Sequence, residues 1–319
     1  CDGWIPCSKH GWGPTSNSGW DSVLFDVNGR QMTPVLQNTS LFVHSHKVGS
    51  LYKKNRAEDL VDIVSLPDLA VLVADAKGVD YPEDDFLHYR VNKNVYFDGV
   101  NQDRDFYGLM SREGQMVISA EQYASIGLFH KTKQIAAVTK LRPDYKYNEH
   151  ASTLDNIGHL YGVIDAKGQE LISCQYAYVL PINGDGYIKV HQKDRLLLMG
   201  LDGKLSIFKT TGELVAATNY TIPATLVYLG GYLQKDYVTV TDGENVMTMG
   251  FDGIAGAPEM SQTEFMDAAL APLRDSLNSL KLKHKTVSAE DIHNENPWTK
   301  LLSLCQCLCF GDEAAAQKM

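Results

Sequence analysis

The sequence predicts an all-β fold built from repeated β-hairpin units. Six times along the 319-residue chain, a short hydrophobic run ends in a polar turn closed by glycine, and a second hydrophobic run follows. Such self-similarity is typical of repeat architectures, in which one hairpin cannot bury its apolar face alone. Six short units lie within the roughly four to eight blades of a propeller, so a propeller-like domain is expected. The turn glycines are Gly29, Gly78, Gly114, Gly168, Gly212 and Gly253.

Turn chemistry and strand propensity both indicate that each unit is a hairpin. A glycine that closes a short loop supplies the left-handed residue of a type I turn followed by a bulge. Asp26, Asp75 and Asp165 stand three residues before their glycines, where a carboxylate accepts hydrogen bonds from turn amides. The flanks are rich in Val, Ile, Leu and Tyr, which favour strands. The alternating residues 187–191 predict a further strand in the fourth unit.

Two units carry a tyrosine-glycine pair in front of the turn. The clearer one spans residues 161–172 and reads Tyr-Gly-Val-Ile-Asp-Ala-Lys-Gly-Gln-Glu-Leu-Ile; the other begins at Tyr107-Gly108. These units resemble the bacterial WG (tryptophan-glycine) repeat, with tyrosine at the tryptophan position. The resemblance is clear only around residues 106–125 and 161–205.

The sequence departs from the family where prolines follow the second strand, since Ser119-Ala120 and Ser173-Cys174 stand there. The resemblance implies an all-β, propeller-like binding module, and it implies no established reaction.

Composition argues against several classes of function. The formal net charge is −10, the pI is about 5.4, and no basic stripe is present. Nucleic-acid binding is not expected, because it requires Lys and Arg to neutralise phosphates. No apolar run approaches the roughly 18 residues of a membrane-spanning helix. The chain contains no phosphate-binding loop, nucleophile elbow or clustered histidines, so no cofactor, metal or catalytic set is expected.

The first 21 residues are expected to form an irregular arm. Glycine-tryptophan pairs place Trp4, Trp12 and Trp20 eight residues apart. One interpretation is an exposed aromatic patch for a sugar or a peptide, because tryptophan offers a large contact area and an N–H donor. The alternative is that the tryptophans pack onto the β-domain.

The chain begins at Cys1. Bacterial lipoproteins begin with a cysteine after their signal peptide is cleaved, and lipid on that residue holds them to the membrane. The alternative is an arbitrary boundary that falls on a cysteine. Cys1 is therefore a candidate lipid-attachment residue, and a disulfide between Cys1 and Cys7 is a further alternative.

Residues 22–258 are expected to hold the repeats, with inserts at 53–68 and 142–159. The second insert is polar and is expected to be a surface loop, the kind of segment that carries function more often than strands do. Residues 259–319 predict a helical appendage, with Ser261 or Thr263 as its N-cap. Its apolar stripe has helical spacing and consists of Met266, Leu270, Leu273, Leu277 and Leu280.

A second helix is expected from Trp298 to about Phe310, and it contains Cys305, Cys307 and Cys309. Soft thiolates bind zinc or copper(I), cysteines near a membrane are acylated, and cysteines in an oxidising compartment form disulfides. They also serve as small apolar residues. The sequence leaves these alternatives open.

Three functions follow as hypotheses. The first is a non-catalytic binding or scaffolding module for a protein or a peptide. The second is a lipoprotein of the bacterial cell envelope that binds glycan or assembles with surface proteins, using Cys1 as anchor and Trp4, Trp12 and Trp20 as contacts. The third is a carbohydrate-active propeller enzyme with carboxylates around a central channel. An envelope or secreted location is expected, with the cytoplasm as the alternative; the ligand, oligomeric state and number of units stay open.

Overall fold

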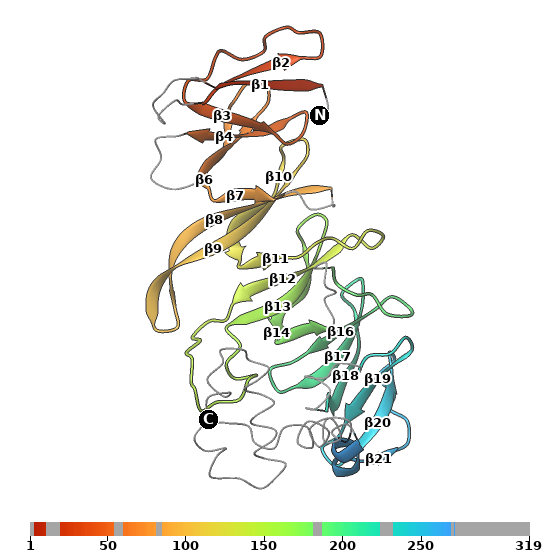
Figure 1. Ribbon diagram of the computed structural model, residues 1–319. Helices are drawn as coiled ribbons and strands as arrows, with labels where there is room; N and C mark the ends of the chain where they lie inside the picture. The colour runs from red at the N-terminus through yellow and green to blue at the C-terminus, as the bar shows by residue number, and fades with distance from the viewer. Residues whose placement is uncertain are drawn as a thin grey trace, which may run out of the picture. The chain divides into compact units, whose positions relative to one another are not determined.

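Antiparallel β-sheet makes up nearly all of the structure (Figure 1). The computed structural model describes residues 3–10, 20–53, 60–80, 85–180, 187–223, 232–268 and 271. Strands that follow one another in the chain pair with each other, so that each sheet is a meander. The all-β prediction is confirmed, and the expected hairpins at Gly114, Gly168 and Gly212 belong to larger sheets.

The chain divides into two compact units, Cys1–Asn219 with Phe251–Gly253, and Tyr220–Gly250 with Ile254–Met319. The first unit begins with a two-stranded sheet of β1 (Trp4–His10) and β2 (Trp20–Asp26). A four-stranded sheet follows: β3 (Thr39–Val43), β4 (Val48–Lys53), β5 (Val61–Ser65) and β6 (Val71–Ala76). The next comprises β7 (Gly78–Asp80), β8 (Phe86–Phe97), β9 (Val100–Ser111) and β10 (Met116–Tyr123).

The fourth sheet contains β11 (Ser125–Ile126), β12 (Ile135–Leu141), β13 (His159–Asp165) and β14 (Glu170–Tyr176). It is followed by β15 (Tyr178–Leu180), β16 (Arg195–Met199), β17 (Lys204–Lys209) and β18 (Leu214–Thr221). In the second unit, the end of β18 is followed in sheet order by β19 (Tyr237–Thr241), β20 (Asn245–Gly250) and β21 (Met260–Ser261).

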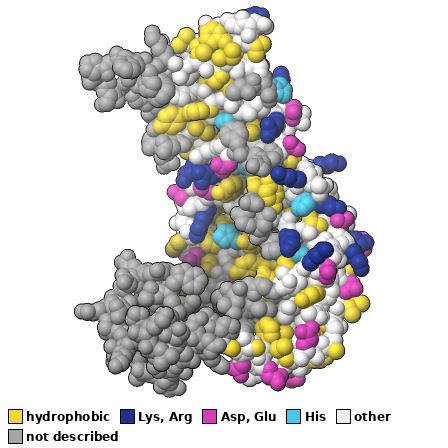
Figure 2. Space-filling view, turned by 45° about the vertical axis from the view of Figure 1, so that its right-hand side comes forward, with side chains coloured by type: hydrophobic (Ala, Val, Ile, Leu, Met, Phe, Trp, Pro, Cys, Tyr) yellow, Lys and Arg dark blue, Asp and Glu magenta, His cyan; other side chains and the backbone are white. Residues whose placement is uncertain are grey.

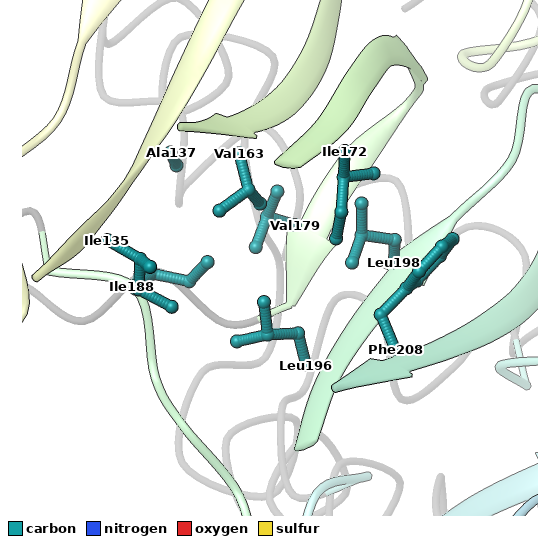
Figure 3. Packing of buried hydrophobic residues seen from close by; sticks show 9 residues of the cluster. All are labelled: Ile135, Ala137, Val163, Ile172, Val179, Ile188, Leu196, Leu198 and Phe208. Atoms are coloured by element: carbon teal, nitrogen blue, oxygen red, sulfur yellow. The ribbon is translucent and has the colours of Figure 1, made fainter. Parts of the chain in front are cut away.

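Hydrophobic cores lie between successive sheets of the first unit. One cluster joins Val48 and Ile63 of the second sheet to Leu87 and Phe106 of the third. A similar cluster joins the third sheet to the fourth. Figure 3 shows the cluster between the fourth sheet and β15–β17: Ile135, Ala137, Val163, Ile172, Val179, Ile188, Leu196, Leu198 and Phe208. Four-stranded meanders that share cores with their neighbours in chain order are the arrangement of propeller blades, so the fold is propeller-like.

The glycine turns share one backbone geometry. Gly29, Gly114, Gly168, Gly212 and Gly253 have φ between 79° and 88°, the left-handed region that glycine enters at little cost. In the β13–β14 hairpin, the Gly168 N–H donates to the Asp165 carbonyl over 3.0 Å. The Asp165 carboxylate accepts two further turn amides at 2.9 Å each, and Asp26 does the same in its turn.

The prediction of a hairpin turn at Gly78 is wrong. Gly78 is the first residue of β7 and has no positive φ. The corresponding hairpin, β5–β6, is closed by residues 66–70 without glycine, and Leu69 takes the left-handed position at φ 57°. Asp75 is itself left-handed at φ 55°, and its N–H donates to Asp62 Oδ1 over 3.3 Å. The prediction from local turn composition failed here because a non-glycine residue, Leu69, takes the left-handed position.

Most turn glycines also lie against the preceding sheet. A Cβ added to Gly212 would lie 2.3 Å from the Leu171 carbonyl oxygen on β14, and one on Gly168 would lie 2.8 Å from Ile118 Cγ1 on β10. Gly253 differs, because its added Cβ would lie 2.4 Å from the Cβ of Ala216 on β18, a strand of its own sheet. Gly29, in the first sheet, has no atom within 4 Å of that position. The repeated glycine therefore serves both the turn and the close approach of neighbouring sheets.

Three segments differ from their predicted form or extend beyond the described residues. Residues 4–10, expected to be irregular, form β1, which pairs with β2 in register from Trp4↔Asp26 to His10↔Trp20. Residues 187–191 make only isolated bridges, and β15 supplies the added strand instead. A short helix at 262–268 begins after Ser261, whose Oγ accepts the Glu264 N–H over 3.3 Å.

The Glu264 carboxylate accepts the Ser261 N–H over 2.9 Å in return, which completes a capping box. Within the predicted apolar stripe, Met266 is 40% exposed. The other members of the stripe, the predicted helix from Trp298 and the three cysteines in it lie outside the described residues.

Candidate functional site: a cleft beside the long β8–β9 hairpin

The β8–β9 hairpin is the longest in the described part of the chain (Figure 1), with 12 residues in each strand. Its strands pair in register from Phe86↔Ser111 to Phe97↔Val100. Both residues of the connecting turn have positive φ, 56° at Asp98 and 79° at Gly99, which is the type I′ turn that matches the twist of paired strands. This local geometry makes the extended hairpin possible.

The outer half of the hairpin extends beyond its neighbours in the sheet. β7 pairs with β8 only between His88 and Arg90, and the β9–β10 ladder begins at Tyr107. Residues 91–97 and 100–106 therefore pair only with each other among the described strands.

The two faces of this half differ in chemistry, because successive side chains of a strand point to opposite faces. On one face, Asn92 and Asn94 donate from Nδ2 to the carboxylates of Asp105 and Asp103, each over 3.0 Å. On the other face, Val95 packs against the core shared with the second sheet, and Phe106 belongs to that core.

The loop at 142–158 packs against the tip of the hairpin. The rings of Tyr145 and Phe97 stack with their centroids 5.1 Å apart. The Tyr147 N–H donates to Asp98 Oδ1 over 2.7 Å. A Cβ on Gly158 would lie 2.8 Å from Phe97 Cζ, so this contact requires a residue without a side chain. The insert that the sequence set apart thus forms a wall against the hairpin.

Two hollows lie between the hairpin and this part of the fourth sheet, and we name them together the hairpin cleft. The first has a volume of about 560 Å³ and is lined by Tyr96, Phe97, Asp98 and residues 141–146. The second has a volume of about 420 Å³ and is lined by Lys77, Asn92, Asp103, Arg104, Asp105, Tyr107, Ala124, Leu141 and His159. Leu141 lines both. Their volumes lie within the roughly 300–1,000 Å³ of ligand pockets.

Charged groups in the hairpin cleft are paired at close range. Lys77 Nζ lies 3.7 Å from Asp105 Oδ1, and Arg90 Nη1 lies 3.6 Å from Asp105 Oδ2. The Arg104 guanidinium lies 4.8 Å from the centre of the Phe97 ring, the geometry of a cation–π contact.

Burial, followed by the charge of Arg104, lowers the pKa of His159 below its usual value. His159 is therefore a neutral ring near pH 7. The cleft combines aromatic rings, paired charges and hydrogen-bonding groups, which are the groups that proteins commonly use to bind a ligand or a partner.

The structure places the residues singled out in the sequence elsewhere. Trp4 is half-buried against the Leu24 and Leu41 cluster, and its Nε1–H donates to the His46 carbonyl over 2.5 Å. Trp4 therefore packs on the β-domain. Trp12 and Cys1 lie outside the described residues, and only the backbone of Trp20 is described.

The two described cysteines, Cys7 and Cys174, are not among the residues that line the cleft. Within the described ranges, no group of three or more His, Cys, Asp or Glu side chains could hold a metal ion. Cys7 is an exposed free cysteine. Burial raises the pKa of the Cys174 thiol to about 12, which keeps it protonated and unreactive.

Sequence reasoning missed the hairpin residues of the cleft. A signal was present, since Asp98-Gly99 between alternating runs is a strong local indication of a hairpin. No repeat glycine is centred there, so the periodic pattern gives no indication of this hairpin.

Comparisons with known proteins bear on the repeat. A family profile described as "WG containing repeat" matches residues 161–194, which confirms the resemblance over that unit. A search of the curated proteins found no match.

Solved structures similar to this chain include an acylaminoacyl peptidase from Pyrococcus horikoshii, 12% identical, with a TM-score of 0.27; the comparison covers 80% of this chain and 43% of that one. The β-propeller domain of the Trilobed protease from Pyrococcus furiosus is 14% identical, with a TM-score of 0.25 and 81% of each chain covered. This chain therefore spans less than half the length of the first of these proteins. Among the described residues, no helix has the length and apolar character needed to cross a membrane.

Proposed function

We propose that this chain, which carries a WG-containing repeat at residues 161–194, is a non-catalytic module that binds a protein or peptide in the hairpin cleft. The observation that carries the proposal is the construction of the cleft. A hairpin that extends past its own sheet is held by a loop from the next sheet, and two hollows remain beside it. Binding residues are commonly placed on loops that a rigid scaffold positions.

The chemistry of the cleft supports a recognition role. Tyr96, which lines the larger hollow, is 70% exposed, and Tyr147, whose N–H donates to Asp98, is 62% exposed. Exposed tyrosines are enriched in protein contact surfaces. The carboxylates of Asp103 and Asp105 are engaged by Asn94, Asn92, Lys77 and Arg90. Such paired groups provide orientation and specificity in a complex. Basic and acidic side chains are intermixed on the face shown in Figure 2.

A photo-crosslinking experiment tests the proposal. A photoreactive amino acid is incorporated at Tyr96 in the producing cell, and a matched variant carries it at Val27, which is 65% exposed in the turn after β2. We expect a discrete protein adduct from Tyr96 that is absent from Val27 and is lost when Tyr145→Ala removes the stacking partner of Phe97. Equal labelling from both positions, or an adduct that survives Tyr145→Ala unchanged, would contradict binding in the cleft.

A further inference from the structure

One edge of β9 carries main-chain groups that have no strand partner among the described residues. In a type I′ hairpin, the residues that flank the turn, Phe97 and Val100, exchange hydrogen bonds, and bonded and non-bonded pairs then alternate along the ladder. Asn101, Asp103 and Asp105 therefore occupy non-bonded pairs with β8. Their N–H and C=O groups point away from β8, toward the edge that β10 leaves open before Tyr107.

This open edge borders the smaller hollow of the cleft. Asp103, Arg104, Asp105 and Tyr107 line one side of it, and Ala124, Leu141 and His159 line another. The hollow thus offers a row of main-chain hydrogen-bonding groups next to a partly apolar wall. An extended segment that adds to a sheet edge uses these same two features, main-chain bonds for affinity and alternate side chains for specificity.

We propose that a partner peptide binds as an added strand on the β9 edge at Asn101, Asp103 and Asp105. The proposal rests on the binding function assigned to the hairpin cleft and specifies its mode. It also specifies the partner, an extended segment with a basic residue opposite Asp103 and apolar residues at the positions on either side of it.

Charge selects this occupant over a second copy of the chain. A residue opposite Asp103 on the added strand projects to the same face as this carboxylate, which accepts a hydrogen bond from Asn94, so Lys or Arg is favoured there. Asp105 is already paired with Lys77 and Arg90, so it adds no preference for a further cation. Two copies paired through this edge would set carboxylates against carboxylates, and like charges directly opposite each other destabilise a strand pair. The intervening residues of the added strand project to the other face, toward Leu141 and the neutral ring of His159. Arg104 also projects to this face, with its guanidinium over the Phe97 ring, so apolar residues rather than basic ones are favoured at these positions.

A pair of methylated peptides tests the mode of binding directly. The probe is an acetylated, amidated hexapeptide that alternates lysine and valine. In the proposed register the lysine N–H groups point toward β9 and the valine N–H groups point toward solvent. N-methylation of the lysines should weaken binding to the native chain by about tenfold or more, because it removes donors from several main-chain hydrogen bonds. N-methylation of the valines is the matched control and should leave binding nearly unchanged.

Variants of the chain provide the reciprocal test, read by fluorescence anisotropy of the labelled peptide. Asp103→Pro removes the outward N–H, and proline is tolerated on an edge strand where its N–H is not used in the ladder. It should abolish binding of the peptide, while Asp103→Ala, which keeps the N–H, should weaken it by only a few fold.

Absence of binding to the native chain, or equal binding of the two methylated peptides, would overturn strand addition. If photo-crosslinks at Tyr96 persist in that case, binding in the cleft stands and only the mode is refuted. If both fail, the cleft is not the binding site.

Discussion

The close approach of the turn glycines to the preceding sheet predicts a large penalty for one methyl group. Gly212 has φ 88°, and a Cβ added there would lie 2.3 Å from the Leu171 carbonyl oxygen and 2.9 Å from its carbonyl carbon. Both are backbone atoms of β14, so relief requires a movement of the β17–β18 hairpin against the fourth sheet. Gly212→Ala therefore introduces a steric clash as well as a left-handed alanine.

Gly29 and Gly99 separate the two contributions. Their φ values are 80° and 79°, and no atom lies within 4 Å of the added Cβ at either position. Their alanine variants should lose about 1–2 kcal/mol of stability from the backbone conformation alone. Gly212→Ala should lose about 1–3 kcal/mol more, the usual cost of overpacking.

The assay is urea unfolding followed by far-ultraviolet circular dichroism, with the free energy of unfolding compared at equal m-value. Gly212→Ala should unfold at a clearly lower urea concentration than Gly29→Ala and Gly99→Ala. If all three variants lose the same stability, the glycine is required for the turn alone, and the argument for packing between sheets is refuted.

Three further predictions concern other parts of the chain. Burial lowers the pKa of His44 from 6.5 to about 4, so the folded chain binds fewer protons than the unfolded chain between these values, and stability should fall by about 2 kcal/mol as the pH falls from 6.5 to 4. Urea titrations at pH 7 and pH 4 should show a smaller difference for His44→Gln; an unchanged difference would assign the pH dependence to other groups. Asp165→Ala removes the acceptor of two turn amides and should cost about 1–2 kcal/mol, measured by the same urea assay with the exposed Asp202→Ala, which accepts one amide, as the milder comparison. Lipid on Cys1 predicts that the native gene product fractionates with membranes and carries a lipid-sized mass increase on its N-terminal peptide; an unmodified cysteine at that position contradicts the lipoprotein hypothesis.

The turns and the strands were predictable because their causes are local. The left-handed glycines at 114, 168 and 212 and the carboxylates at 26 and 165 act within about five residues of chain. Ser261 was one of two proposed caps, and the structure shows the reciprocal bonds with Glu264 that select it. At Gly78 the same local reasoning failed, because Leu69 takes the left-handed position in a turn that has no glycine.

The cleft was only partly predictable. The polar insert at 142–159 was recognisable as a loop of functional interest, and Asp98-Gly99 marked the tip of a hairpin. Nothing in either segment indicated that Tyr145 would stack on Phe97 or that Tyr147 would bond to Asp98. For Trp4 the sequence left two alternatives open, a contact surface and packing onto the β-domain, and its ring packs against the Leu24 cluster.

The sequence by itself determined the class of fold and the hairpin unit, because backbone conformation at glycine, turn capping by aspartate and alternation of apolar residues are short-range effects. Tertiary structure decided which surfaces these units bury against one another and which edges they leave open. Gly212 lies against Leu171. Residues of β9 that precede Tyr107 have no partner on β10. Such contacts join segments that are distant in the chain, and their energies depend on the shape of both partners. The edge of β9 is open only because no described strand of the folded chain pairs with it there.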